Sequence, residues 1–169
     1  MSRQRVFFAA RPPAPVLSQI EQCADACLVG PSRRVATSAL HLTLCFLGSL
    51  EPAQIERAAK TANDLAHAPI KLVFERCEYR RRQQLVWLRA RPNRTLSDFV
   101  AALRAGLEHA GVPFDARDHL AHMTLARAAR EGHCGDCEIA WRIDHFELLS
   151  STPSAQGSVY QRLYAWPLK

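Results

Sequence analysis

The sequence predicts a mixed α and β fold in which two similar halves surround a shared cleft. The main observation is a repeated pattern, in which a histidine, an apolar residue, a threonine and an apolar residue occur at 41–44 and again at 122–125. A second observation is that the order strand, helix, strand leads into each copy of the pattern. Repetition of this kind indicates an internal duplication, whose pseudo-twofold axis would bring the two copies together.

Each copy of the pattern has the alternation of a half-buried β-strand. Alternate side chains of a strand face opposite sides, so His41 and Thr43 are predicted to share one face. His122 and Thr124 are predicted to share a face in the same way. Two such faces opposite each other would form a cleft with two imidazoles and two hydroxyls. The alternative is a pair of half-buried strands, each with an ordinary histidine.

The composition is that of an ordinary globular protein, and we expect residues 1–169 to form a single domain. The 169 residues are 48% hydrophobic and 22% charged, and they include no apolar run of about twenty residues. The apolar stretch near the N-terminus is too short for a secretory signal, so we expect a soluble, cytoplasmic protein that does not bind membranes. The net charge of +6 favours a polyanionic partner. Charge alone does not distinguish nucleic acid, a nucleotide and simple solubility.

The first half of the chain contains four predicted elements. A short buried strand at 6–10 ends at two prolines, and apolar residues at helical spacing predict a helix at 15–28. A basic segment with Arg33 and Arg34 leads into the first pattern strand, at 40–47. A second helix is predicted from Pro52, because proline is accepted in a first helical turn.

The second half begins with a predicted hairpin and continues with a helix that Gly111 ends. The hairpin strands lie at 70–74 and 85–88. Thr95 and Asp98 resemble a capping box at the start of the helix. The remaining predictions are, in order, the second pattern strand at 120–126, a polar loop at 130–137, and strands at 139–149 and 159–166.

The residue types of the repeated pattern suit phosphodiester chemistry. Imidazoles titrate near neutral pH, so two of them can act as base and acid in one step. Threonine hydroxyls on the same faces can donate hydrogen bonds to phosphate oxygens. Together they suit the opening of a phosphodiester without a metal.

Longer stretches of the sequence resemble the 2H phosphoesterase superfamily, and most closely its RNA 2′,3′-cyclic phosphodiesterases, also called 2′-5′ RNA ligases. These stretches are Val6-Phe-Phe-Ala, His41-Leu-Thr-Leu-Cys-Phe-Leu-Gly48, His122-Met-Thr-Leu-Ala-Arg127 and Tyr164-Ala-Trp-Pro-Leu168. The resemblance implies an α+β fold of two pseudo-symmetric, intertwined lobes. Each lobe would be an antiparallel sheet with outer helices, and the lobes would enclose a central cleft.

The resemblance also implies a reaction and roles for residues. The reaction is hydrolysis of a terminal RNA 2′,3′-cyclic phosphate to a 2′-phosphomonoester, with 2′-5′ ligation as its reverse. His122 would be the proton acceptor and His41 the proton donor, while Thr43 and Thr124 would hold the phosphate. Arg127 matches a phosphate-contacting arginine of the family, but strict alternation puts it on the opposite face, so a bulge or the strand end must turn it inward. We expect a monomer that needs no metal or other cofactor.

Two other functions remain open from the sequence. One is a phosphodiesterase for small nucleotide cyclic phosphates, and the other is a nucleotide- or RNA-binding module without turnover. For the RNA substrate, we expect Arg80, Arg81 and Arg82 at the hairpin tip to contact the strand behind the cyclic end. The alternative for these arginines is a solvated charged turn.

The cysteines and the remaining histidines have simpler interpretations. Cys134 and Cys137 have a metal-like spacing, and Cys23 with Cys27 is a conceivable ligand pair, but no second Cys-x-x-Cys exists. Reduced thiols are therefore favoured over a zinc site. Surface or structural roles are expected for the other five histidines, which are His67, His109, His119, His133 and His145.

Overall fold

A computed structural model describes residues 3–155 and 157–169, which form two antiparallel sheets and three α-helices. The helices are α1 Ala14–Cys27, α2 Pro52–Asn63 and α3 Arg94–His109, with a short 3₁₀ turn η1 at Thr37–Ala39. The strands are β1 Gln4–Ala10, β2 Arg33–Arg34, β3 Leu42–Leu50, β4 Ile70–Arg80, β5 Leu85–Ala90, β6 His122–Arg127, β7 Gly135–Ile143, β8 His145–Ser154 and β9 Gly157–Pro167.

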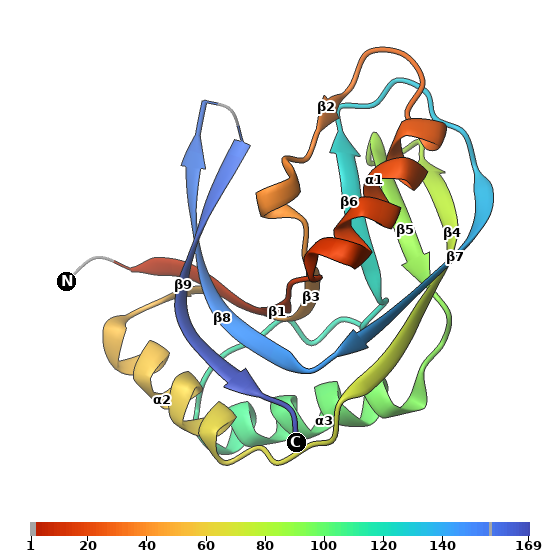
Figure 1. Cartoon of the computed structure of the whole chain (residues 1–169). Helices are drawn as coiled ribbons and strands as arrows, with labels where there is room; N and C mark the ends of the chain where they lie inside the picture. The colour runs from red at the N-terminus through yellow and green to blue at the C-terminus, as the bar shows by residue number, and fades with distance from the viewer. Residues whose placement is uncertain (1–2, 156) are drawn as a thin grey trace.

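The two sheets have matching strand orders. Sheet A runs β3-β1-β8-β9, and sheet B runs β2-β6-β5-β4-β7. Apart from the two-residue strand β2, each strand of sheet A has a counterpart at the same place in sheet B. The two pattern strands, β3 and β6, are counterparts, and they contact each other where the sheets meet (Figure 1). The predicted α+β class and its two related halves are confirmed.

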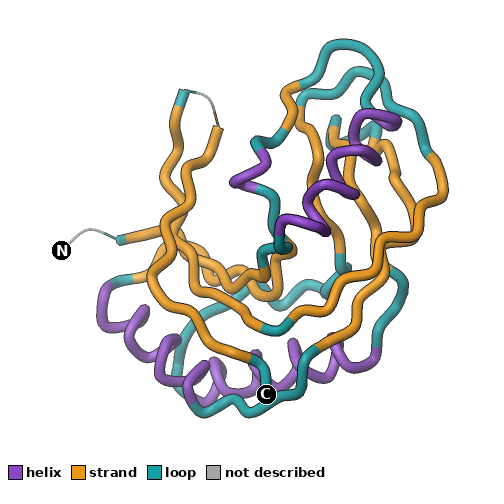
Figure 2. Tube along the Cα trace, viewed as in Figure 1, coloured by secondary structure: helices purple, strands orange, loops and turns teal. Residues whose placement is uncertain are grey.

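The helices cover the outer faces of the sheets. Helix α1 packs against β4 and β7 of sheet B, while α2 and α3 lie side by side, with α2 against β9 and α3 against β3 and β4 (Figure 2). One hydrophobic cluster runs through both sheets, and its largest fully buried side chains include Phe8, Phe74, Phe99 and Phe146. This shared core fixes the sheets relative to each other, so residues on their inner faces keep a defined separation.

Helix α3 begins earlier than its predicted capping box. Asn93 is the N-cap, and its side-chain oxygen accepts a hydrogen bond of 2.9 Å from the backbone N–H of Leu96. Thr95 lies inside the first turn, so the capping box predicted from Thr95 and Asp98 is wrong. Asparagine caps as well as threonine does, and Asn93 comes first in the chain. The predicted stop is confirmed, because Gly111 adopts a left-handed φ of 64° two residues after the helix.

The strand predicted at 139–149 is wrong, because the chain leaves one sheet and enters the other at Asp144. Strand β7 pairs with β4 in sheet B, whereas β8 pairs with β1 and β9 in sheet A. Strand β7 also begins at Gly135, inside the segment predicted to be a loop. Polar and apolar residues alternate on both sides of Asp144, but the apolar positions shift from 139, 141 and 143 to 146 and 148. The two successive polar residues Asp144 and His145 mark this shift, which a prediction of one continuous strand overlooks.

Candidate active site

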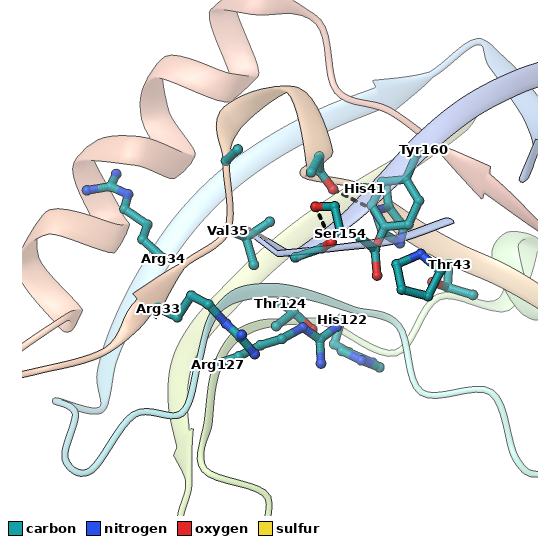
Figure 3. A pocket seen from close by; sticks show the side chains of 15 residues that line it. Arg33, Arg34, Val35, His41, Thr43, His122, Thr124, Arg127, Ser154 and Tyr160 are labelled. Carbon is teal, nitrogen blue, oxygen red and sulfur yellow. Dashed lines mark hydrogen bonds between the residues drawn. The ribbon is translucent and has the colours of Figure 1, made fainter. Parts of the chain in front are cut away.

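A cavity of about 410 Å³ between the inner faces of the two sheets brings the repeated patterns together. His41 and Thr43 line it from one side, and His122 and Thr124 line it from the other (Figure 3). His41 directly precedes β3, and His122 is the first residue of β6. The predicted pairing of two imidazoles and two threonines across a cleft is therefore present.

Arg127 also lines this cavity, because a β-bulge turns it inward. In the β5–β6 pairing, Trp87 lies opposite Thr124 and Val86 lies opposite Ala126, so Leu125 has no partner. The extra residue shifts the alternation by one position, and Arg127 joins the face of Thr124. From the sequence, an inward-facing Arg127 required either a bulge or the end of the strand, and the structure has the bulge.

Both pattern histidines are held by the same kind of hydrogen bond. Nδ1 of His41 lies 2.7 Å from the carbonyl oxygen of Ala39, and Nδ1 of His122 lies 2.7 Å from that of Leu120. A carbonyl only accepts, so each Nδ1 carries its proton and donates it. Each Nε2 is consequently the ring atom that takes up or releases a proton.

Aromatic side chains support both imidazoles. The ring of His41 packs against Phe7 and Tyr160, with centroid distances of 5.0 Å and 4.9 Å, and these two rings also contact each other at 5.3 Å. The ring of His122 packs against Trp87 at 4.2 Å. The indole N–H of Trp87 donates a hydrogen bond of 3.1 Å to the carboxylate of Glu78, which fixes this support in place.

Both pattern histidines have a lowered pKa. Burial is the main cause for each, and the hydrogen bond to the backbone carbonyl acts in the opposite direction. The charge of Arg127 lowers the pKa of both imidazoles further, and a protonated His122 lowers that of His41. Since a charge on one ring disfavours a charge on the other, the state in which both imidazoles are protonated is disfavoured.

The cavity has a basic lining that suits an anion. Arg33 lies opposite Arg127 in the β2–β6 pairing, and both line the cavity together with Arg34 (Figure 3). Arg34 is held by an ion pair with Asp25 of α1. No aspartate or glutamate is among the described residues that line this cavity. In the sequence, Arg33 and Arg34 were noted only as a basic segment and not as site residues. Their position just before a pattern strand was the signal that could have placed them at the cavity.

The three arginines at the hairpin tip are placed differently from one another. The guanidinium of Arg80 lies over the ring of Trp87, 4.7 Å from its centroid, and 3.6 Å from the carboxylate of Glu78. Its charge contributes to the lowered pKa of His122. Arg81 and Arg82 are exposed in the turn that joins β4 and β5. The structure thus brings only Arg80 close to the pattern residues.

His119 has the structural role that the sequence predicted. Its Nε2 lies 2.9 Å from the backbone carbonyl oxygen of Thr43, to which it donates a hydrogen bond. This contact joins the segment before β6 to the first pattern strand. It therefore helps to fix the distance between the two halves of the site.

The described residues offer no metal site. Within 3–155 and 157–169, no group of three or more His, Cys, Asp or Glu side chains is placed to hold a metal ion. Cys134 instead accepts a hydrogen bond from the N–H of Tyr79, and Cys137 donates one to the carbonyl of Phe74. The zinc alternative is therefore not supported, and all six cysteines are free thiols. None of the helices in the described part of the chain combines the length and the apolar character that crossing a membrane requires.

Comparison with known proteins gives consistent matches along the whole chain. The sequence model of the 2′-5′ RNA ligase superfamily matches residues 12–152. The RNA 2′,3′-cyclic phosphodiesterase of Escherichia coli (strain K12) is 28% identical over 170 residues, which cover 98% of this chain and 97% of that protein. The crystal structure of E. coli LigT complexed with 3′-AMP covers 99% of both chains at 27% identity, with a TM-score of 0.85. A crystal structure described as a phosphoesterase covers 98% of both chains at 27% identity, with a TM-score of 0.86.

The family match contains most of the residues that line the cavity. It extends from the residues just before α1 into β8, and so it includes both pattern strands, the bulge before Arg127 and the β2 arginines. The chain therefore belongs to the 2′-5′ RNA ligase superfamily.

Proposed function

We propose that this protein hydrolyses the 2′,3′-cyclic phosphodiester end of RNA to a 2′-phosphomonoester. One observation carries the proposal, which is that two imidazoles with fixed Nδ1 protons face one basic cavity. Such a pair supplies a proton acceptor and a proton donor on two sides of a phosphate. The threonines and the arginines beside them supply hydrogen bonds and positive charge for its oxygens.

The proposed reaction uses these side chains in one displacement at phosphorus. Neutral His122 accepts a proton from water through Nε2 while the water oxygen bonds to phosphorus. The bond between phosphorus and the 3′ oxygen breaks, and protonated His41 gives its Nε2 proton to that oxygen. Thr43, Thr124 and Arg127 stabilise the charge on the non-bridging oxygens. The assignment of acceptor and donor follows the family resemblance. In 2′-5′ ligation the 5′-hydroxyl of a second RNA takes the place of the water, its oxygen bonds to phosphorus and the bond from phosphorus to the 3′ oxygen breaks, so ligation is a parallel displacement and not the reverse of hydrolysis.

The relatives support a nucleotide substrate. The E. coli relative bears the name RNA 2′,3′-cyclic phosphodiesterase, and LigT structures are described as complexes with 3′-AMP, ATP, NADP+ and phosphate. We infer that the substrate here is RNA with a cyclic phosphate end. We also propose a monomer that acts in the cytoplasm, where free thiols such as these six cysteines stay reduced.

The test is hydrolysis of a short RNA with a 2′,3′-cyclic end by wild type and by His41→Ala and His122→Ala. Each variant should lower kcat by about two to four powers of ten, which is the typical contribution of acid–base catalysis. His109→Ala is the matched control, because His109 lies on the outer helix α3 and outside the cavity, and it should keep wild-type activity.

Two further measurements complete this test. A chelator should leave the rate unchanged, and the product should be a 2′-phosphomonoester. A mononucleotide 2′,3′-cyclic phosphate in the same assay separates an RNA enzyme from a small-nucleotide enzyme. Activity that a chelator abolishes and a divalent ion restores would contradict the mechanism, as would full activity of either variant.

A further inference from the structure

We propose that Cys23 and Cys77 form a peroxide-sensitive dithiol, in which oxidation joins helix α1 to strand β4 through a reversible disulfide. The site lies beneath α1, on the outer side of sheet B. Among the described residues, none lines both the cavity at these thiols and the catalytic cavity. The proposal therefore goes beyond the proposed function and does not rest on it.

The first observation is that thiols from three elements meet at one place. Cys23 and Cys27 are four residues apart in α1, so their side chains leave the same side of the helix. Helix α1 packs on β4 and β7, which carry Cys77 and Cys137 (Figure 1). The thiols of Cys77, Cys27 and Cys137 all lie within hydrogen-bonding reach of Cys23. Cys23 is therefore surrounded by three possible disulfide partners.

The second observation is access for a small oxidant. Cys23 is half-buried, and it lines a cavity of about 440 Å³ together with Cys27 and Cys137. One water molecule takes up about 30 Å³ of liquid, so a molecule as small as hydrogen peroxide fits into this space. Cys77 is fully buried and does not line the cavity. A peroxide therefore reaches Cys23 before Cys77.

The third observation explains why Cys23 reacts before the other two thiols of this cavity. Only the thiolate attacks a peroxide. Hydrogen bonding from neighbouring thiols, mainly that of Cys77, lowers the pKa of Cys23 against the opposing effect of burial. Burial raises the pKa of Cys27 and that of Cys137. At neutral pH, Cys23 thus has the largest thiolate fraction of the three.

The partner that closes the disulfide follows from the placement of the neighbouring thiols. Cys27 is a poor partner, because Cα–Cβ bonds one turn apart in a helix run parallel, whereas a disulfide brings its Cβ atoms to about 3.8 Å. Cys137 is held by another contact, since its thiol donates a hydrogen bond of 3.6 Å to the carbonyl of Phe74. Cys77 is the main hydrogen-bonding neighbour of Cys23 and lies on the strand that faces it.

The proposed oxidation consumes one molecule of hydrogen peroxide. The thiolate sulfur of Cys23 bonds to one peroxide oxygen, the O–O bond breaks, and the departing oxygen takes up a proton as water. Cys23 is then a sulfenic acid. The sulfur of Cys77 bonds to that of Cys23, and the sulfenic oxygen leaves with the proton of Cys77 as a second water. Two thiols are oxidised to one disulfide, and the peroxide is reduced to two waters.

The experiment treats the reduced full-length protein with one equivalent of hydrogen peroxide at neutral pH. Remaining thiols are blocked with iodoacetamide, and disulfides are mapped by mass spectrometry without reductant. Trypsin combined with a protease that cleaves before aspartate puts every cysteine on its own peptide, because Asp25 separates Cys23 from Cys27 and Asp136 separates the last two cysteines. We expect the Cys23–Cys77 disulfide as the main product, and dithiothreitol should reverse it.

Three variants test the separate roles. Cys23→Ser should slow disulfide formation at Cys77 about tenfold, because the remaining thiols are less ionised. Cys77→Ala should leave Cys23 as a sulfenic acid that dimedone traps. Cys134→Ser is the matched control and should react like wild type, because Cys134 lies outside this cavity and accepts a hydrogen bond from the N–H of Tyr79.

The outcomes are decided by the disulfide map of wild type, even if a variant fails to fold. Exposure alone predicts that Cys134 reacts first, since it is the one exposed thiol among the six. Oxidation of Cys134 before Cys23 would overturn the proposal, as would a disulfide from Cys23 to Cys27 or Cys137, or no disulfide at all. A wild-type protein that forms the Cys23–Cys77 disulfide but hydrolyses no cyclic phosphate would refute the proposed function and leave the dithiol standing.

Discussion

Glu147 is a buried carboxylate that depends on arginine partners. Replacement of its main partner, Arg11, tests how much this ion pair contributes to the free energy of unfolding. The side chain of Glu147 is only 2% exposed, in the middle of sheet A. Arg11 donates two hydrogen bonds to its two oxygens, at 2.6 Å and 2.9 Å, and Arg162 contributes a longer one at 3.4 Å. Arg11→Met keeps a long apolar stem and leaves the carboxylate with Arg162 alone.

The expected cost follows from these contacts. Removal of one partner of a buried ion pair typically costs about 3 to 5 kcal/mol. The side chain of Arg11 is 35% exposed and Arg162 remains, so the lower end applies and we expect a loss of about 3 kcal/mol. With a urea dependence of about 2 kcal/mol per molar, the unfolding midpoint should fall by about 1.5 M. Tryptophan fluorescence in urea at pH 7 measures this shift.

The pH dependence tests the reason for the loss. Burial raises the pKa of Glu147, but the hydrogen bonds and charges of Arg11 and Arg162 outweigh it, and the pKa lies below its usual value. The stabilisation is therefore present above the unfolded-state pKa of about 4.3 and is lost as the pH falls. In Arg11→Met the carboxylate protonates more readily, so the gap between variant and wild type should shrink at pH 3. An equal gap at pH 7 and pH 3 would refute the electrostatic explanation, and Arg162→Met should show a smaller gap.

Three further predictions concern activity. Because the pKa of His41 and that of His122 are both lowered, the maximum of kcat/KM against pH should lie below about 6.5. Arg127→Gln removes a charge that lowers both values and should move the maximum to higher pH, and an unmoved profile would show that Arg127 does not act on the imidazoles. Thr43→Val or Thr124→Val should each lower kcat/KM, with a loss of transition-state stabilisation of about 1.5 to 3 kcal/mol that is smaller than the loss caused by replacing either histidine. Wild-type kinetics would show that the hydroxyl does not touch the phosphate. Replacement of Arg80, Arg81 and Arg82 by alanine should flatten the logarithmic salt dependence of RNA binding by about 0.7 per lost phosphate contact, while unchanged slopes would leave the three as a solvated turn.

Local sequence signals were sufficient to locate most helices and strands and to predict the pairing of the two pattern histidines. Helical spacing and strand alternation depend on nearest neighbours, so the helices and the strands β1, β3, β4, β5, β6 and β9 could be located from the sequence. The pairing of His41 with His122 was also predictable, because the pattern occurs twice. Even the bulges left a signal, since each threonine is followed by two apolar residues in succession, Leu44 with Cys45 and Leu125 with Ala126.

The rest of the site depends on contacts between segments that are distant in sequence. Arg33 reaches the cavity because β2 pairs with β6. Tyr160 reaches His41 because β9, at the edge of sheet A opposite β3, contacts the turn η1 just before His41. Neither residue stands in a pattern that differs from an ordinary basic or strand segment. The crossing at Asp144 has a local signal, because the apolar positions change from odd to even numbers there. The partners of β7 and β8 nevertheless lie in two different sheets, and no local pattern identifies them.

The two halves of the site are alike at the histidines and differ beside them. Each imidazole is held at Nδ1 by a carbonyl two residues earlier, and burial lowers the pKa of each. The hydrogen bond at Nδ1 and the direction of the pKa shift are therefore the same for both rings and do not make one the acid and the other the base. A β-bulge follows the threonine in both pattern strands, at Leu44 in β3 and at Leu125 in β6. These bulges supply the asymmetry, because they present Phe46 on one side and Arg127 on the other. We expect the substrate to be oriented by these unequal neighbours, and this orientation would decide which imidazole meets water and which meets the departing 3′ oxygen.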